Sequence, residues 1–113
     1  MEKIVYKKPQ FIEGLTFYVE PGKVDAYIQA EEEIWLDDLS RMPGFLGSET
    51  WGSEDKKGEV TTFYFWESEE AYKAIDPEFL AEHKKQSMYA VESEFVRAWH
   101  EKERLYRVRE ARV

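Results

Sequence analysis

The segment EEIWLDDLSRMPGFLGSETW, residues 32–51, contains the helix-to-strand change that decides the fold. Its first half continues a helical pattern, because apolar residues recur three and four positions apart. Proline cannot continue a helix and glycine readily adopts a positive φ, so Met42-Pro43-Gly44 ends it. The segment Phe45–Trp51 then predicts a strand. The predicted inner face of the helix holds Val24, Tyr27, Ile28, Glu31, Trp35 and Leu39, with Ile34 beside it.

Upstream of this helix, residues 11–19 (FIEGLTFYV) have the alternation of a strand. One face carries Phe11, Glu13, Leu15, Phe17 and Val19, and the other carries Ile12, Gly14, Thr16 and Tyr18. A glycine inside a strand indicates a bulge or the close approach of another group, which we expect at Gly14. Residues 1–10 are predicted to form an N-terminal arm.

Downstream, Phe45–Trp51 and Glu59–Trp66 predict a hairpin joined by the polar loop Gly52–Gly58. Ser68 is the expected N-cap of a helix over 69–75. Asp76-Pro77 begins another helical stretch. Its predicted inner side holds Phe79, Leu80, His83, Met88, Val91, Phe95 and Val96. A final strand over 103–113 completes the order βαββαβ, which is the order of ferredoxin-like α+β domains with an antiparallel sheet.

The composition limits the class of protein. With 113 residues, the chain is long enough for one domain, which we place over 1–113. The formal net charge of −8 argues against nucleic acid or an anionic membrane as partner. No cysteine is present, which excludes disulfides and thiolate metal sites. No apolar run approaches the ~20 residues of a membrane span, so we expect a cytoplasmic protein.

Two motifs resemble the antibiotic biosynthesis monooxygenase-like superfamily. They are the quoted PGFLG turn-and-strand, and the stretch FYFWESEEAY over 63–72, in which Trp-x-Ser-x-Glu-Ala opens a helix. The resemblance covers about residues 12–85 and implies a dimeric α+β barrel. Members of this superfamily include cofactor-free quinone-forming monooxygenases, haem-degrading monooxygenases and proteins without demonstrated activity, so the fold does not choose among these functions.

The haem-degrading relatives carry a haem-ligating histidine on a helix like the one that holds His83. They also have an asparagine on the first strand and a tryptophan on the intervening helix. In this chain Glu13 or Gly14 occupies the first of these places, and Ala74 or Ile75 occupies the second. A lone helical histidine is also compatible with an ordinary surface or partly buried side chain. We therefore expect no cofactor, with haem as the alternative, and the acidic cluster over 31–38 lacks the histidines of a metal site.

The quinone-forming relatives hold a phenolic substrate with Trp, Tyr and Asn side chains. This chain has no asparagine, and its candidate substrate-binding residues are Tyr18, Trp35, Tyr64 and Trp66. The alternative is that these aromatic side chains belong to the core.

Glu13 and His83 are the candidate catalytic residues for proton transfer. Glu13 shares a strand face with Phe11, Leu15 and Phe17, where a charge needs a partner. A raised pKa in an apolar cleft would make Glu13 a general base. Alternatively, it pairs with Arg107 or Arg109 across a strand or subunit boundary.

Three functions follow. They are a cofactor-independent monooxygenase acting on a small aromatic or quinol-like substrate, a haem-binding or haem-degrading protein, and a non-enzymatic small-molecule-binding dimer. All three agree with a homodimer formed through sheet faces, because helices on one face leave the other uncovered. We expect Phe11, Leu15 and Phe17 on that uncovered face, and the C-terminal strand to be a candidate for exchange between subunits.

Overall fold

The computed structural model describes residues 1–7, 10–75, 78 and 96–113. Its strands are β1 (Glu2–Val5), β2 (Phe11–Val19), β3 (Phe45–Gly52), β4 (Glu59–Trp66), β5 (Val96–Tyr106) and β6 (Arg109–Arg112). Its helical segments are η1 (Pro21–Lys23), α1 (Val24–Glu31), the π-helical turn η2 (Glu32–Leu36), α2 (Asp37–Leu39) and α3 (Glu69–Lys73).

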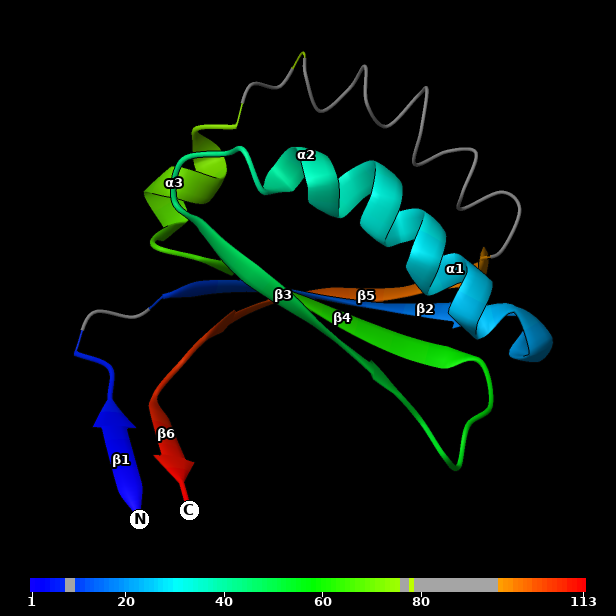
Figure 1. Cartoon of the computed structure of the whole chain (residues 1–113), viewed down its shortest axis with the longest axis horizontal. Coiled ribbons are helices and arrows are strands. Elements are labelled where there is room, and N and C mark those ends of the chain that lie inside the picture. Colours follow the sequence, from blue (N-terminus) through cyan, green and yellow to red (C-terminus); the bar gives the residue numbers. More distant parts are fainter. Residues whose placement is uncertain (8–9, 76–77, 79–95) are drawn as a thin grey trace.

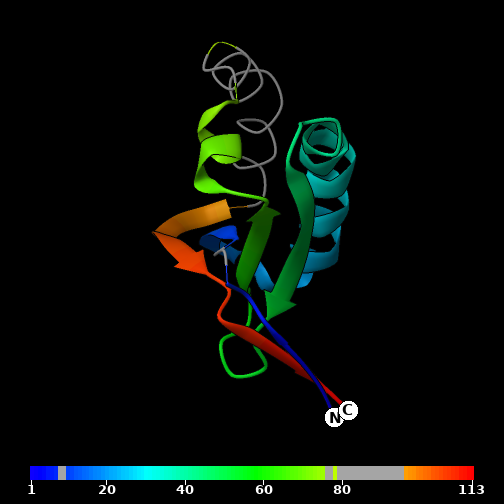
Figure 2. The same ribbon diagram turned by 90° about the vertical axis from the view of Figure 1, so that its left-hand side faces the viewer.

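Four antiparallel strands form the main sheet in the order β3-β4-β2-β5. The first and last strands of the chain, β1 and β6, pair separately into a two-stranded ribbon. Figure 1 shows the helices above the four-stranded sheet and the ribbon below it. Figure 2 shows α1 and α3 beside each other on the same side of that sheet. The predicted α+β ferredoxin-like fold is therefore confirmed.

The alternation of β2 has the predicted consequence for burial. Phe11, Phe17 and Val19 are buried on the face toward the helices, where they contribute to two core clusters. At Gly14, on the opposite face, a Cβ would lie 3.3 Å from Leu105 Cδ1 and 3.4 Å from Phe63 Cε1. The expected close approach at this glycine is therefore confirmed.

The two quoted motifs meet in space. Gly44 has a φ of 83°, and a Cβ there would lie 2.6 Å from Ala71 Cβ, so only glycine fits. The Gly44 carbonyl accepts a hydrogen bond from the Glu67 amide at 2.8 Å. Ser68 Oγ accepts from the Ala71 amide at 3.1 Å, which confirms the predicted N-cap of α3. The motifs thus hold the start of β3 against the start of α3.

Several sequence-based expectations need correction. Phe11, Leu15 and Phe17 do not lie on an uncovered face, because they pack beneath the helices. Val96 begins β5 and does not belong to a helix, since β5 pairs with β2 from this residue onward. The arm contains β1, and the C-terminal run divides between β5 and β6, with Arg107 and Val108 between them. Of these strands, β1 pairs with β6, and β5 pairs with β2.

The predicted helical residues Phe79, Leu80, His83, Met88, Val91 and Phe95 lie outside the described residues. Within the described residues, no helix has both the length and the apolar content to cross a membrane.

Candidate functional site

A buried carboxylic acid and a buried tyrosine meet between the helix and the sheet. Glu31 ends α1 and Tyr64 lies on β4; each is 3% exposed. The Tyr64 hydroxyl donates a hydrogen bond to Glu31 Oε1 at 2.5 Å. Glu31 faces inward because it lies four residues after the buried Tyr27 and eight before the buried Leu39. The π-helical turn begins directly after it, and such turns are frequent at functional sites.

Burial changes the proton affinity of both groups. Loss of solvation raises the pKa of Glu31, and the neighbouring charge of Glu32 adds to this rise, whereas the hydrogen bond from Tyr64 opposes it. The pKa of Tyr64 is raised well above its usual value, first by burial and then by the charge of Glu31. Tyr64 therefore keeps its proton and remains a donor, while Glu31 is a stronger base than a solvated glutamate.

The sheet extends this pair into a polar row. Glu13 on β2, Tyr64 on β4 and Ser48 on β3 are direct neighbours across the three strands. Glu13 is partly buried, and its charge contributes to the raised pKa of Tyr64. The row brings two carboxyl groups and two hydroxyls to the helix-facing side of the sheet, where one carboxyl is fully enclosed.

The candidate aromatic residues have different positions. Trp66 is buried against Phe45 and Tyr72, with ring centroids 5.1 and 5.9 Å away. Trp35 is partly buried and packs against the same core cluster. Tyr18 lies on the opposite face of the sheet from Tyr64, so the structure does not bring it to the polar row. Tyr64, one of the predicted substrate-binding residues, thus shares a hydrogen bond with a buried ionisable group.

Of the two predicted catalytic residues, the structure describes the position of one. Glu13 lies in the polar row, and His83 lies outside the described residues. Nothing in the acidic run over 31–33 distinguishes Glu31 by residue type. Its position on the inner helical face was the available signal, but the sequence does not show which strand residue faces it.

Two surface hollows lie at opposite ends of the main sheet. One, of about 280 Å³, lies beside the β3–β4 loop and is lined by Pro21, Val24, Gly52, Ser53, Glu54, Lys57, Gly58, Glu59 and Val60. The other, of about 240 Å³, is lined by Gln10, Phe11, Glu69, Arg104, Leu105 and Tyr106. This second groove reaches Phe11, which shares a strand face with Glu13 two residues away. Among the described residues, no three His, Cys, Asp or Glu side chains are grouped to hold a metal ion.

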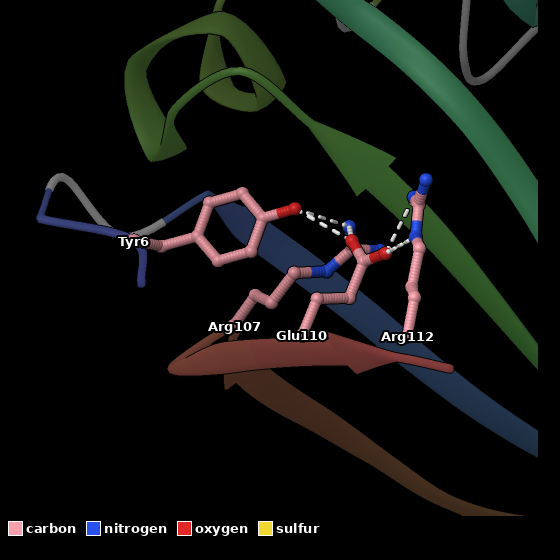
Figure 3. A network of polar contacts seen from close by, with 4 residues as sticks. All are labelled: Tyr6, Arg107, Glu110 and Arg112. Carbon is pink, nitrogen blue, oxygen red and sulfur yellow. Dashed lines mark hydrogen bonds and ion pairs between the residues drawn. The ribbon is translucent and has the colours of Figure 1, made fainter. Parts of the chain in front are cut away.

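Two C-terminal arginines, Arg107 and Arg112, bind Glu110 of the terminal ribbon (Figure 3). Glu110 Oε1 accepts hydrogen bonds from Tyr6 at 2.6 Å and from Arg107 at 2.8 Å, and Glu110 Oε2 accepts from Arg112 at 2.6 Å. The Tyr6 and Arg112 bonds lower the pKa of Glu110. The Arg107 guanidinium also lies 4.7 Å from the centroid of the Phe65 ring. The cluster therefore joins both ends of the chain to the main sheet.

This cluster bears on the partner expected for Glu13. The ion pair of Arg107 is made with Glu110 and not with Glu13. The arginine opposite Glu13 in the β2–β5 register is Arg104, whose guanidinium lies 3.2 Å from Glu69.

Solved structures of similar fold cover nearly the whole chain. A protein from Shewanella oneidensis is 21% identical with a TM-score of 0.62, over 95% of this chain and 98% of its own. A dimeric ferredoxin-like protein from an uncultured marine organism is 17% identical with a TM-score of 0.69, over 94% of each chain. A Streptomyces coelicolor monooxygenase in complex with nanaomycin D is 19% identical with a TM-score of 0.65, over 93% of this chain and 91% of its own.

At these identities the three structures establish a shared fold. None of the curated protein sequences matches the chain. The sequence model of the antibiotic biosynthesis monooxygenase family, however, matches residues 11–75, which are more than half of the chain. The matched range includes β2, the helical segments from α1 to α2, and the hairpin strands β3 and β4, and therefore both Glu31 and Tyr64. The chain belongs to the antibiotic biosynthesis monooxygenase family.

Proposed function

We propose that this protein is a cofactor-independent monooxygenase that oxidises a small phenolic or quinol-like substrate with dioxygen. The observation that carries the proposal is the enclosed Glu31–Tyr64 pair. Removing the proton of a phenol requires a base, and a carboxylate of raised pKa is better matched to that task than a solvated one. Family membership supports a monooxygenase, and the complex of the Streptomyces relative with nanaomycin D supports a small-molecule ligand.

In this mechanism Glu31 accepts the hydroxyl proton of the substrate. The electron-rich phenolate then reduces dioxygen. One oxygen atom forms a new carbon–oxygen bond to the ring, and the other leaves as water with the hydroxyl hydrogen and one ring hydrogen. Phenol and dioxygen thus give quinone and water, without an external reductant. Tyr64 holds the Glu31 carboxyl in place through its hydrogen bond, and the fixed polar row supplies a preorganised environment for the substrate anion.

The test is oxygen uptake with 1-naphthol as the probe. We expect enzyme-dependent consumption of dioxygen, with one 1,4-naphthoquinone formed per dioxygen and no accumulation of hydrogen peroxide. An oxygen electrode and the quinone absorbance follow the two quantities together. Uptake no faster than in the protein-free solution, with 1-naphthol and with 1,5-dihydroxynaphthalene, would contradict the proposal.

A hemin titration separates this function from the haem alternative. If the protein acts without a cofactor, adding hemin should neither give a Soret band dependent on His83 nor be needed for oxygen uptake. A Soret band that is lost in His83→Ala would favour haem binding.

We further propose that two copies associate through the open face of the main sheet. On that face Trp51 is exposed and Thr16, Tyr18, Phe63, Phe65 and Leu105 are half-buried, whereas Ile12 and Gly14 are buried. Trp51 is 62% exposed and its ring packs edge-on against Phe63, with centroids 6.2 Å apart. Exposed apolar surface of this kind is typical of association sites, and a two-fold axis lets one patch cover itself. The marine relative is described as dimeric, which supports a dimer of this chain.

Light scattering at micromolar concentration should report about twice the mass of one chain, as expected for a two-fold dimer. Trp51→Glu places a charge on the open face and should shift the mass toward that of one chain. Glu54→Gln, in the exposed β3–β4 loop, is the matched control and should leave the mass unchanged. A wild-type protein with the mass of a single chain would refute the dimer.

A further inference from the structure

Ser48 on β3 carries an enclosed hydroxyl without a hydrogen-bond partner. Its Oγ is the one buried side-chain polar atom in the described part of the chain that lacks such a partner. Buried hydroxyls are normally hydrogen-bonded, because leaving one unpaired costs its lost hydration. Serine is also easily replaced by alanine at such a place without disturbing the packing. Packing alone therefore does not explain why a hydroxyl group lies at this position.

A β-bulge gives Ser48 this orientation. Phe45 is opposite Trp66, but the next pairs are Gly47 with Phe65 and Ser48 with Tyr64, so Leu46 is the extra residue. In a regular strand, Phe45 and Ser48 would point to opposite faces because their spacing is odd. Here the Phe45 ring packs against Trp66 on the helix-facing side, and Ser48 lies in register with Tyr64 on that same side.

Glycine at position 47 makes this bulge possible. Gly47 has a φ of 142°, a conformation that side chains with a Cβ rarely adopt. Leu46 is left exposed on the surface. Bulges are common next to active sites, where they change the direction of a side chain. In this chain the bulge turns a hydroxyl toward the layer that contains Glu31 and Tyr64.

We propose that Ser48 is a substrate-binding residue, whose Oγ hydrogen-bonds an oxygen atom of a hydroxyaryl ligand held in the helix–sheet layer. This inference rests on the proposed function and specifies how the substrate is oriented. A serine hydroxyl both donates and accepts, so it can bind a phenol, a phenolate or a quinone oxygen. The Tyr64 hydroxyl already donates its one hydrogen bond to Glu31, whereas the Ser48 hydroxyl has no partner and is available to a ligand. A ligand oxygen bound by Ser48 would thus lie next to Tyr64, the residue that holds the Glu31 carboxyl.

The test compares Ser48→Ala with Thr50→Val by anaerobic calorimetric titration of 1-naphthol and of naphthalene. Thr50 is the matched control because it lies two residues further on the same strand face and its hydroxyl is already hydrogen-bonded to Thr62 at 3.2 Å. We expect Ser48→Ala to bind 1-naphthol roughly three- to tenfold more weakly, the loss of one neutral hydrogen bond, and naphthalene unchanged. Thr50→Val should bind both ligands as the wild type does.

Thermal unfolding without ligand gives an independent readout. Ser48→Ala should melt at the wild-type temperature or above it, because it removes an unpaired buried hydroxyl, whereas Thr50→Val should melt lower. Wild-type affinity for 1-naphthol in Ser48→Ala, as a buried water on Ser48 would produce, or a clearly lowered melting temperature would overturn the inference and leave the proposed function intact. Failure of the wild-type chain to bind 1-naphthol would contradict both.

Discussion

Replacing Glu31 by glutamine is expected to lower the rate of 1-naphthol oxidation by about 10²–10⁴-fold, the usual contribution of a positioned general base. Glutamine has nearly the same shape and its carbonyl oxygen can still accept the Tyr64 hydrogen bond, but it cannot take the substrate proton. The effect should appear in turnover, with little change in substrate affinity. Steady-state oxygen uptake measures both quantities.

Glu33→Gln is the matched control for this substitution. Glu33 is exposed and accepts a hydrogen bond from Gln29 at 3.1 Å, so its replacement should leave turnover within a factor of about two, as for other surface changes. Equal turnover in Glu31→Gln and the wild type would show that Glu31 is not the base.

The stability of Glu31→Gln relative to the wild type should also depend on pH. Burial raises the pKa of Glu31 in the folded state, so the folded chain binds this proton more tightly than the unfolded chain. The contribution of Glu31 to stability is therefore full below the pKa of the unfolded chain and is lost as the pH rises through the folded pKa. Glutamine does not titrate, so the gain in stability of Glu31→Gln over the wild type should increase across that interval. Denaturant unfolding at several pH values measures this difference.

Replacing Trp66 by alanine is expected to lower the free energy of unfolding by about 3–5 kcal/mol, the range for large aromatic side chains in a core. Trp66 is 2% exposed, and its ring packs edge-on against Phe45 and Tyr72. It thereby joins β4 to the start of β3 and to α3. The cavity left by alanine should also loosen the packing around Tyr64, which lies two residues earlier on the same face of β4.

Trp66→Phe provides the comparison, because it retains a ring against both neighbours. Its cost should be clearly smaller, and its affinity for 1-naphthol should equal that of the wild type if Trp66 belongs to the core. Weaker binding in Trp66→Phe with unchanged unfolding free energy would instead place Trp66 at the substrate, as the sequence comparison with quinone-forming relatives predicted. Chemical denaturation and calorimetric titration of the same samples distinguish the two roles.

Local patterns in the sequence were sufficient to predict the architecture. The alternation of residues 11–19, the helix from Val24 to Leu39, the hairpin and the Ser68 cap are each determined by neighbours in the chain. Period and capping depend on short-range sterics and hydrogen bonding, so they can be inferred without a partner segment. Their order was enough to indicate the ferredoxin-like topology, and the two motifs were enough to indicate the family.

The terminal strands were less predictable, because their structure depends on pairing between distant segments. Residues 2–5 pair with β6, which lies about a hundred residues later in the chain. No local turn joins two strands at this separation, so the sequence around residues 2–5 does not specify their partner. The same holds for the bond between Tyr6 and Glu110, and for the choice of Glu110 over Glu13 as the partner of Arg107.

By itself, the sequence determined the elements, their order and the residues available for each face. The tertiary structure alone decided which polar groups meet inside. Glu31 and Tyr64 are 33 positions apart and become partners because the end of α1 packs onto the sheet beside Tyr64. The extra residue at Leu46 reverses the direction of Ser48, since a one-residue shift in a strand of period two exchanges its faces. Which face of a strand a helix covers is a property of packing, and the candidate site arises from that packing.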